Sequence, residues 1–488
     1  MTSRSQLVTI RSLILAAVLC LGAGAGNTAL AAASGADDVG RSMVDYSFER
    51  ASVEFYKNTQ PQALLDGAVD GMRAAVKGHG GDPKKLPALH DGGSNSADIA
   101  ALNHELLLAD HEFGATIGDR NLAYAAIDGM MQSLNDRWTV FMTPKEYRSL
   151  NEGLDGGNFA GVGIVIDVDP TTKSLLVVQT IDGGPAEKAG LQAGDVILTV
   201  DGKTTQGLTT EQDSSLIRGK AGTTVQLTVQ RSGEPKPMPV TITRATIQVP
   251  SVRSRVLDGD IGYVQVLVFG LTTGQELSSA LVKLDKQGVK GVILDLRNNG
   301  GGYLDAAIDV SSLFVPEGPI VSIDSRSKPL TTYDAENTAE APRPLAVLVN
   351  GFTASASEIT SGAIQDSGAG VLIGSRTFGK GVVQTIYPLP DGSAIKITTA
   401  RYLTPNGRDI NSVGIAPDIP VEDVKANDLG KPATDGQLQR ALAYIQQRIA
   451  AAQDDGKPQT PASQPPAATT SQSAPQSPAT TQAPGGTQ

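Results

Sequence analysis

The amino-acid sequence predicts a multidomain α+β protein with a helical N-terminal region, a β-rich module, an α/β core and a disordered tail. Apolar residues recur at three- and four-residue spacing up to about residue 150, which is typical of helices. Short β-branched runs broken by glycine follow, and strand and helix patterns alternate after about residue 246. With 488 residues, the chain is long enough for two or three domains.

The composition is that of a globular protein, with 40% hydrophobic and 19% charged residues. The net charge of −11 argues against nucleic acid as a main partner, because a polyanion is bound by basic surfaces. The negative net charge excludes no other class of function.

Residues 1–33 have the pattern of a secretory signal peptide. Arg4 and Arg11 precede the apolar run 13–21, and small residues follow it. The apolar run is too short to span a bilayer as an anchor. Cleavage would remove Cys20, the only cysteine, and leave no disulfide, no thiolate nucleophile and no zinc–cysteine site.

Residues 41–150 are predicted to be helical, with the clearest patterns at 96–111 and 121–134. All the histidines of the chain lie in this region, and they are His79, His90, His104 and His111. Metal binding by them stays open beside the commoner solvated or capping roles. Catalysis further along the chain would have to proceed without imidazole unless this region folds over it.

Residues 155–245 are predicted to form a compact β-rich module. Its β-branched runs lie at 162–167, 174–178, 195–200 and 224–229. A short helix with a glycine stop is expected at 184–190.

Residues 246–425 are predicted to be an α/β domain, because strand and helix patterns alternate. Strands are expected at 262–266, 291–296, 344–349 and 370–373. Helices are expected at 274–287, at 303–313 and directly after Ala354. A last helix at 436–452 precedes the tail 458–488, which has no charged residue and no aliphatic side chain larger than alanine. Such a tail cannot form a core and is expected to be disordered.

The segment Thr353-Ala-Ser-Ala-Ser-Glu358 follows the strand at 344–349 and offers two roles for Ser355. Ser355 and Glu358 fit the S-x-x-E capping box, which opens a helix. A serine at a helix start after a buried strand is also presented outward as a nucleophile, with the Ala356 amide directed at any oxyanion formed there. Both interpretations stay open on this segment alone.

Lys380 lies in Gly374-Ser-Arg-Thr-Phe-Gly-Lys-Gly381, which mimics the phosphate-binding pattern GxxxxGK[ST]. Gly381 replaces the hydroxyl residue that would hold magnesium, and 382–386 is predicted to be a strand instead of a helix, which argues against nucleotide binding. A lysine between two glycines usually reaches solvent. Directed into a pocket instead, it would have a lowered pKa and could act as a base. Gln384 would lie on the same strand face and could hold the amine.

A glycine run follows the buried strand at 291–296, in Asp295-Leu-Arg-Asn-Asn-Gly-Gly-Gly302. It is either a flexible loop or a place where backbone amides approach a reacting group closely. One of these amides, together with that of Ala356, would form a two-donor oxyanion hole. The three segments jointly supply a nucleophile, a base, a group that orients the base, and oxyanion donors, all without histidine.

These segments resemble motifs of the carboxy-terminal processing, or tail-specific, serine proteases. They are T-A-S-A-S-E at 353–358, F-G-K-G-V-V-Q at 378–384 and D-L-R-N-N-G-G-G at 295–302. The domain order is similar too, and 135–147 is similar to the family stretch D-x-x-S-x-F-L-T-P-E-E-Y. Within that stretch, Trp138-Thr139 departs from the family's usual aromatic and serine, outside the catalytic motifs. The resemblance covers about residues 45–425.

The resemblance implies an α/β protease core of the ClpP/crotonase type, with Ser355 as the nucleophile and Lys380 as the base. It implies that Gln384 supports the lysine and that the amides of Gly301 and Ala356 form the oxyanion hole. It implies no metal and no organic cofactor.

The module at 155–245 resembles a PDZ domain. The resemblance implies a loop that captures the terminal carboxylate of a peptide, which then adds to the sheet edge as a strand. The residues of this substrate-binding loop are Phe159, Ala160, Gly161, Val162 and Gly163. A glycine-rich bend before a strand is the alternative for the same residues. The implied partners are protein or peptide substrates with apolar C-termini.

The sequence thus predicts an exported serine endopeptidase that cleaves proteins recognised by their C-terminal tails. The alternative is a non-catalytic PDZ-containing protein that captures protein C-termini, against which the intact set of serine, lysine and glutamine argues. The signal peptide and the lack of other cysteines favour the bacterial periplasm, with membrane association left open. An adaptor protein and a homo-oligomer are open as further partners.

Overall fold

The computed structural model describes residues 36–154, 159–169, 172–181, 183–208, 210–247, 250–425 and 428–455. The predicted signal peptide at 1–33 and the predicted disordered tail at 458–488 lie outside these residues. In the described part of the chain, no helix is both long and apolar enough to cross a membrane.

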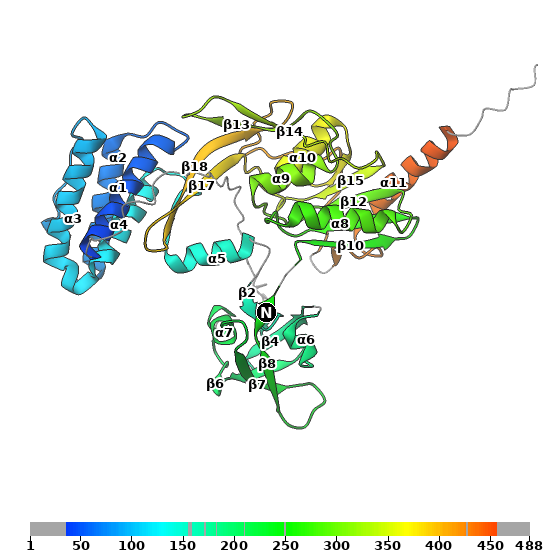
Figure 1. Cartoon of the computed structure of the whole chain (residues 1–488), viewed down its shortest axis with the longest axis horizontal. Coiled ribbons are helices and arrows are strands. Elements are labelled where there is room, and N and C mark those ends of the chain that lie inside the picture. Colours follow the sequence, from blue (N-terminus) through cyan, green and yellow to red (C-terminus); the bar gives the residue numbers. More distant parts are fainter. Residues whose placement is uncertain are drawn as a thin grey trace, which may run out of the picture. The chain divides into compact units, whose positions relative to one another are not determined.

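The N-terminal region is a group of helices around one apolar core (Figure 1). They are α1 (Ala36–Glu54), α2 (Pro61–Gly78), the short η1 (Pro83–Lys85), α3 (Asn95–Ile117) and α4 (Asp119–Ser133). Glycine lets α2 and α4 approach closely, since a Cβ added to Gly71 would lie 2.0 Å from the carbonyl oxygen of Ala125. Apolar residues from much later in the chain complete this core, and they are Leu389, Ile395 and Ile397.

The β-rich module is built on one antiparallel sheet. Its strands in order are β3 (Ile164–Val168), β4 (Leu175–Thr180), β5 (Val196–Val200), β7 (Thr224–Gln230) and β8 (Met238–Thr243), with β6 (Lys203–Thr204) paired to β5. The remaining elements are the paired strands β2 (Phe159–Gly161) and β9 (Ala245–Ile247) and the helices α6 (Pro185–Lys188) and α7 (Thr210–Ile217). Alternate residues of β7 point into the core, as the period of a strand requires: Val225, Leu227 and Val229.

The α/β core contains a mostly parallel sheet. Its strands in order are β10 (Val252–Leu257), β11 (Ile261–Val266), β12 (Gly291–Asp295), β15 (Leu345–Val349), β16 (Val371–Gly374) and β19 (Ile419–Pro420). Every residue of β12 and β15 is buried, as expected for central parallel strands covered on both faces.

Helices cover both faces of this parallel sheet. They are α8 (Thr273–Asp285), α9 (Leu304–Ser312), α10 (Ala356–Ser367) and α11 (Gly436–Asp455). Side chains of α8, α9 and α10 pack with Leu294 and Val347 of the sheet, whereas Leu438 and Ile445 of α11 pack with the alternate residue Ile293. Since alternate residues of a strand point to opposite faces, α11 lies across the sheet from the other three helices.

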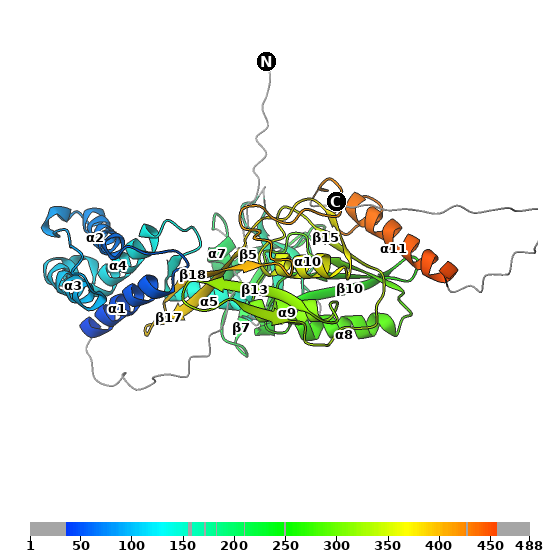
Figure 2. The ribbon, with the colours of Figure 1, turned by 90° about the horizontal axis from the view of Figure 1, so that it is seen from above.

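A second, antiparallel sheet joins segments that are distant in the sequence. Its strands in order are β1 (Val140–Met142), β18 (Ala394–Leu403), β13 (Pro319–Ser325) and β14 (Thr331–Asp334), with β17 (Val382–Pro388) also paired to β18. Figures 1 and 2 show β17 and β18 side by side. Strand β1 comes from the N-terminal part of the chain, just before α5 (Pro144–Leu154), and Val140 pairs with Lys396. Strand β18 therefore pairs both with β1 and with β17, which begins two residues after Lys380.

Candidate active site

Ser355 lies in the turn between β15 and α10, directly before the first helical residue. Its backbone has φ 61° and ψ −120°, a combination that residues other than glycine rarely adopt. Holding a serine there costs on the order of 1–3 kcal/mol, and such strain is typical of nucleophiles on sharp strand-to-helix turns. The turn thus fixes the orientation of Ser355, which is fully buried.

Glu358 belongs to the predicted capping box and also has a second role that the sequence did not predict. Its Oε2 accepts hydrogen bonds from the amides of Ser355 and Lys380, both at 2.9 Å. Its Oε1 accepts one from the Thr377 hydroxyl at 2.5 Å and one from the Gly379 amide at 2.7 Å. Burial raises the pKa of this carboxyl, while the hydrogen bonds oppose the rise. One buried side chain therefore holds the start of α10 and the lysine-bearing segment together.

Lys380 is directed into the protein and is only 1% exposed. The glycines on both sides allow close packing against another loop. A Cβ added to Gly379 would lie 2.8 Å from the amide nitrogen of Gly414, and one added to Gly381 would lie 2.6 Å from that of Asn411. The sequence left open whether the Lys380 side chain reaches solvent or enters a pocket. In the structure this side chain is buried.

The surroundings of the Lys380 amine favour its neutral form. Burial lowers the pKa of Lys380 to about 7, helped by the charge of the buried Lys396, although Glu358 acts in the opposite direction. Nζ lies 4.2 Å from the centroid of the Trp138 ring, which attracts a cation and so also opposes the lowering. Near neutral pH the amine is thus present both with and without its proton.

The stretch around Trp138 is part of this site, although in the sequence it lies outside the three motifs. The Trp138 ring packs edge-on against Phe378, with centroids 6.4 Å apart, and the Arg137 guanidinium lies 4.5 Å from the Trp138 centroid. Trp138 lies outside the catalytic motifs in the sequence, but its ring contacts the Lys380 amine in the structure. The pairing of β1 with β18 brings it to Lys380.

Buried Arg297 fixes the glycine-rich loop after β12. Its guanidinium donates to both carboxylate oxygens of Asp295, at 2.9 and 2.6 Å, and to both of Asp435, at 2.9 and 2.8 Å. The Tyr263 hydroxyl donates to Asp295 at 2.6 Å. Since Asp435 directly precedes α11, this helix also helps to position the loop.

The loop packs directly on the serine turn. The carbonyl oxygen of Asn299 accepts a hydrogen bond from the Ala354 amide at 3.0 Å. Gly301 has φ 100°, and a Cβ there would lie 2.8 Å from both the Ala356 nitrogen and the Ser355 Cβ. The Gly301 amide, however, donates to Asn299 Oδ1 at 2.9 Å, so this arrangement does not support the predicted oxyanion role of that N–H.

Two other amides remain available at the same place. Within the described part of the chain, neither Ala356 nor Gly302 donates its N–H to a hydrogen bond. Gly302 must be glycine, because it has φ 153° and a Cβ would lie 2.0 Å from the Phe269 carbonyl oxygen. Of Gly301 and Gly302, only Gly302 has an N–H without an acceptor among the described residues.

Gln384 lies on β17 and is fully buried. Its Nε2 donates to Thr398 Oγ1 at 3.4 Å, and its Oε1 has no hydrogen-bond partner among the described residues. The predicted hydrogen bond between Gln384 and the Lys380 amine is thus not formed in this arrangement. As for the histidines, no three metal-binding side chains come together in the residues that the structure describes.

Comparison with known proteins identifies the family. Residues 260–421 match the profile of Peptidase family S41, and residues 176–231 match that of the PDZ domain. A carboxyl-terminal-processing protease of Synechocystis sp. is 37% identical over 358 residues, which cover 72% of this chain and 83% of the relative. The chain belongs to the carboxyl-terminal processing serine proteases of family S41.

Two further proteins are similar to this chain in sequence. The carboxy-terminal processing protease CtpA of Bacillus subtilis is 40% identical to this S41 protease over 305 residues, which cover 62% of this chain and 65% of the relative. A solved structure of the photosystem II D1 C-terminal processing protease has 34% sequence identity and a TM-score of 0.41, and the alignment covers 75% of this chain and 94% of that one.

The PDZ domain of this S41 protease has a small groove beside the predicted carboxylate loop. Of the five predicted residues, Gly161, Val162 and Gly163 line the groove, whereas Phe159 and Ala160 do not. Phe159, Ala160 and Gly161 form β2, which pairs with β9. The groove measures about 170 Å³. Its other lining residues come from β3, from α7 and from the position after α7: Ile164, Ile166, Ser214, Ile217 and Arg218.

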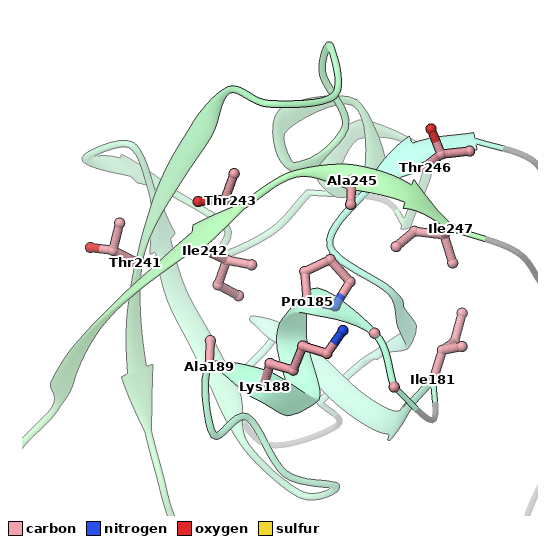
Figure 3. A pocket seen from close by; sticks show the side chains of 12 residues that line it. Ile181, Pro185, Lys188, Ala189, Thr241, Ile242, Thr243, Ala245, Thr246 and Ile247 are labelled. Carbon is pink, nitrogen blue, oxygen red and sulfur yellow. The ribbon is translucent and has the colours of Figure 1, made fainter.

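A larger hollow of about 800 Å³ in the same domain is lined by different residues (Figure 3). Pro185 and Lys188 of α6 face the chain around Ile242 and Ile247 across it, with Ile181 nearby. None of the predicted loop residues lines this hollow. The groove beside α7 is therefore the one that fits the predicted capture of a peptide end.

Proposed function

We propose that this chain is an exported endopeptidase that uses Ser355 as nucleophile and Lys380 as general base, and that selects proteins by their C-terminal tails. The observation that carries the proposal is the buried carboxylate of Glu358, which accepts the backbone N–H groups of both residues. Burial of Lys380, with a pKa of about 7, supports its role as the base, because a neutral amine can take a proton from serine.

In the proposed reaction, the neutral amine of Lys380 takes the hydroxyl proton of Ser355. The serine oxygen bonds to the scissile carbonyl carbon, and the carbonyl oxygen gains a negative charge. The amides of Ala356, at the start of α10, and of Gly302 stabilise that charge. The carbon–nitrogen bond then breaks, the Lys380 ammonium gives its proton to the leaving amine, and a serine ester remains. Lys380 next deprotonates water, which hydrolyses the ester and restores Ser355.

Exposed aromatic side chains give an incoming chain a surface to bind. Phe352, three residues before Ser355, is 66% exposed, and Phe378, two residues before Lys380, is 36% exposed. Large exposed apolar side chains beside a site are typical of surfaces that bind other chains. Such a surface suits an unfolded substrate, whose apolar residues are accessible.

Tail recognition is assigned to the PDZ groove. The amides around Gly161–Gly163 would meet the terminal carboxylate, and Ile164, Ile166 and Ile217 would receive an apolar last side chain. Export to the periplasm rests on the pattern of residues 1–33, and detection of the protein only in the cytoplasmic fraction would reject it.

The test is cleavage of an unfolded protein by the wild type, Ser355→Ala and Lys380→Ala. Wild-type protein should degrade the substrate, and both variants should leave it intact while keeping the wild-type melting temperature. Equal recovery of intact substrate from wild type and Ser355→Ala would reject the protease and favour a non-catalytic binder of C-termini. The same Ser355→Ala variant, used in a pull-down, would capture substrates, any adaptor protein and further copies of the chain.

A further inference from the structure

Thr398 of β18 is held by the N-terminal part of the chain through each of its polar atoms. Its backbone N–H donates to Thr139 Oγ1 at 3.0 Å, and its carbonyl oxygen accepts from the Tyr56 amide at 3.0 Å. Its hydroxyl donates to Asp136 Oδ2 at 2.5 Å. The Thr139 hydroxyl donates to the same Asp136 oxygen at 2.7 Å. One carboxylate therefore orients two threonine hydroxyls.

The orientation of the Thr398 hydroxyl determines which way the Gln384 amide faces. A hydroxyl has one hydrogen and a carboxylate can only accept, so the hydrogen of Thr398 points to Asp136. Thr398 Oγ1 can then only accept from Gln384, which turns Nε2 toward it at 3.4 Å. Gln384 Oε1 is left on the other side as a buried acceptor without a hydrogen-bond partner among the described residues.

We infer that Asp136 is a positioning residue which, through Thr398, presents Oε1 of Gln384 to the ammonium that forms on Lys380. The inference rests on the proposed function, in which Lys380 takes the Ser355 proton. A buried ammonium is costly unless it is paired or hydrogen-bonded, and Gln384 is fully buried on β17, which begins two residues after Lys380. Before the reaction, the hydrogen bonds of Thr398 hold Gln384 in this orientation, so that its Oε1 can accept from Lys380 once the lysine is protonated.

The same N-terminal stretch supplies a second contact to that cation. The Trp138 ring, two residues after Asp136, lies 4.2 Å from Lys380 Nζ and is only 6% exposed. A buried aromatic face stabilises a nearby ammonium. The N-terminal region thereby completes the active site from outside the protease core.

Asp391 offers a matched control for Asp136. It lies in the turn between β17 and β18 and accepts a hydrogen bond from Tyr124 of α4, so it ties the same helical region to the same hairpin. Its other hydrogen bonds come from Ser393, which keeps it apart from the contacts of Thr398. If Asp136 only docks the helical region, the loss of either carboxylate should have the same effect.

The experiment compares kcat, KM and melting temperature for Asp136→Ala, Thr398→Val, Thr398→Ser and Asp391→Ala with a peptide substrate. Both threonine hydroxyls donate to one oxygen of Asp136, which asparagine could replace, so alanine is used to remove the acceptor. Asp136→Ala lets the Thr398 hydroxyl turn to Gln384, and Thr398→Val removes the hydroxyl without changing any charge. Both should lower kcat roughly tenfold or more, with little change in KM, because a hydrogen bond to a charged group is lost. Thr398→Ser should recover most of the activity, and Asp391→Ala should leave kcat unchanged.

A second arm tests whether Asp136 acts through Gln384. In a Gln384→Ala background, Asp136→Ala should cause less than about a twofold further loss, because the acceptor that Asp136 orients is gone. The inference is overturned by wild-type kcat in Asp136→Ala and Thr398→Val, by an equal loss in Asp391→Ala, or by losses that multiply with Gln384→Ala. Full activity of Asp136→Ala beside an inactive Ser355→Ala rejects this inference alone, whereas an active Ser355→Ala rejects the proposed function as well.

Discussion

Replacing Glu358 by glutamine keeps the size of the side chain and turns one acceptor oxygen into a donor group. Each oxygen of Glu358 now accepts two hydrogen bonds. If the new NH₂ group faces the amides of Ser355 and Lys380, two buried N–H groups lose their acceptor. If it faces the other way, the Gly379 amide loses its acceptor, while the Thr377 hydroxyl can turn and accept.

The expected loss of stability is taken from the orientation of the new side-chain amide that leaves only one buried backbone amide without an acceptor. That costs about 1–3 kcal/mol of the free energy of unfolding. In a domain of about 150–250 residues, such a loss lowers the melting temperature by about 2–12 °C. A shift of about 1 Å in a catalytic group can cost on the order of a hundredfold in rate, and the same bonds fix Ser355 and Lys380, so kcat should fall more than the stability loss alone implies.

Thermal unfolding and peptide cleavage measure the two effects of Glu358→Gln. Glu146→Gln is the matched control, because Glu146 accepts the amide and the hydroxyl of Thr143 at 2.8 and 2.7 Å in an exposed position. Water can replace those bonds, so its effect should stay within about 0.5 kcal/mol. Wild-type kcat and melting temperature in Glu358→Gln would refute the idea that this carboxylate holds the two segments together.

Three further predictions follow from particular contacts. Gly301→Ala should abolish peptide cleavage, because its Cβ would lie 2.8 Å from atoms of the Ser355 turn, and wild-type kcat would contradict that packing. Asp435→Asn should lower the free energy of unfolding by about 1–3 kcal/mol in denaturant titration, because it weakens buried hydrogen bonds from Arg297, which stays paired with Asp295, and an unchanged midpoint would contradict this. Amidating the C-terminus of a peptide substrate should lower kcat/KM roughly tenfold, because PDZ amides lose their acceptor, and equal rates for both forms would argue against tail selectivity.

Local patterns predicted the parallel part of the core well. Strands β12 and β15 are continuous apolar runs because both of their faces are buried, and the sequence alone shows such runs. The turn that carries Ser355 also follows from a short motif between a strand and a helix, whereas the motif around Lys380 left open whether that side chain is exposed or buried. The apolar runs and the turn depend on neighbours in the sequence, and residue types alone indicate them.

Contacts between distant segments were not predictable in the same way. Trp138 meets Lys380, and Asp136 meets Thr398, only because β1 pairs with β18, and nothing local to either strand specifies that pairing. The second role of Glu358 depends on how the segment before β17 folds back over α10. The family resemblance implies the Gly301 amide as an oxyanion donor, and the sequence does not show that Asn299 Oδ1 accepts this N–H.

The central claim is that the neutral amine of Lys380 activates Ser355. The most direct test is the rate at which a fluorophosphonate modifies Ser355, followed by mass spectrometry of the labelled peptide from about pH 5 to about pH 9. The wild-type rate should rise with pH through about 7, where the Lys380 amine loses its proton, and then level off. Lys380→Ala and Lys380→Arg should label far more slowly and without that rise, since arginine keeps its proton throughout. Labelling of Ser355 in Lys380→Ala at the wild-type rate, with the same pH dependence, would contradict the account.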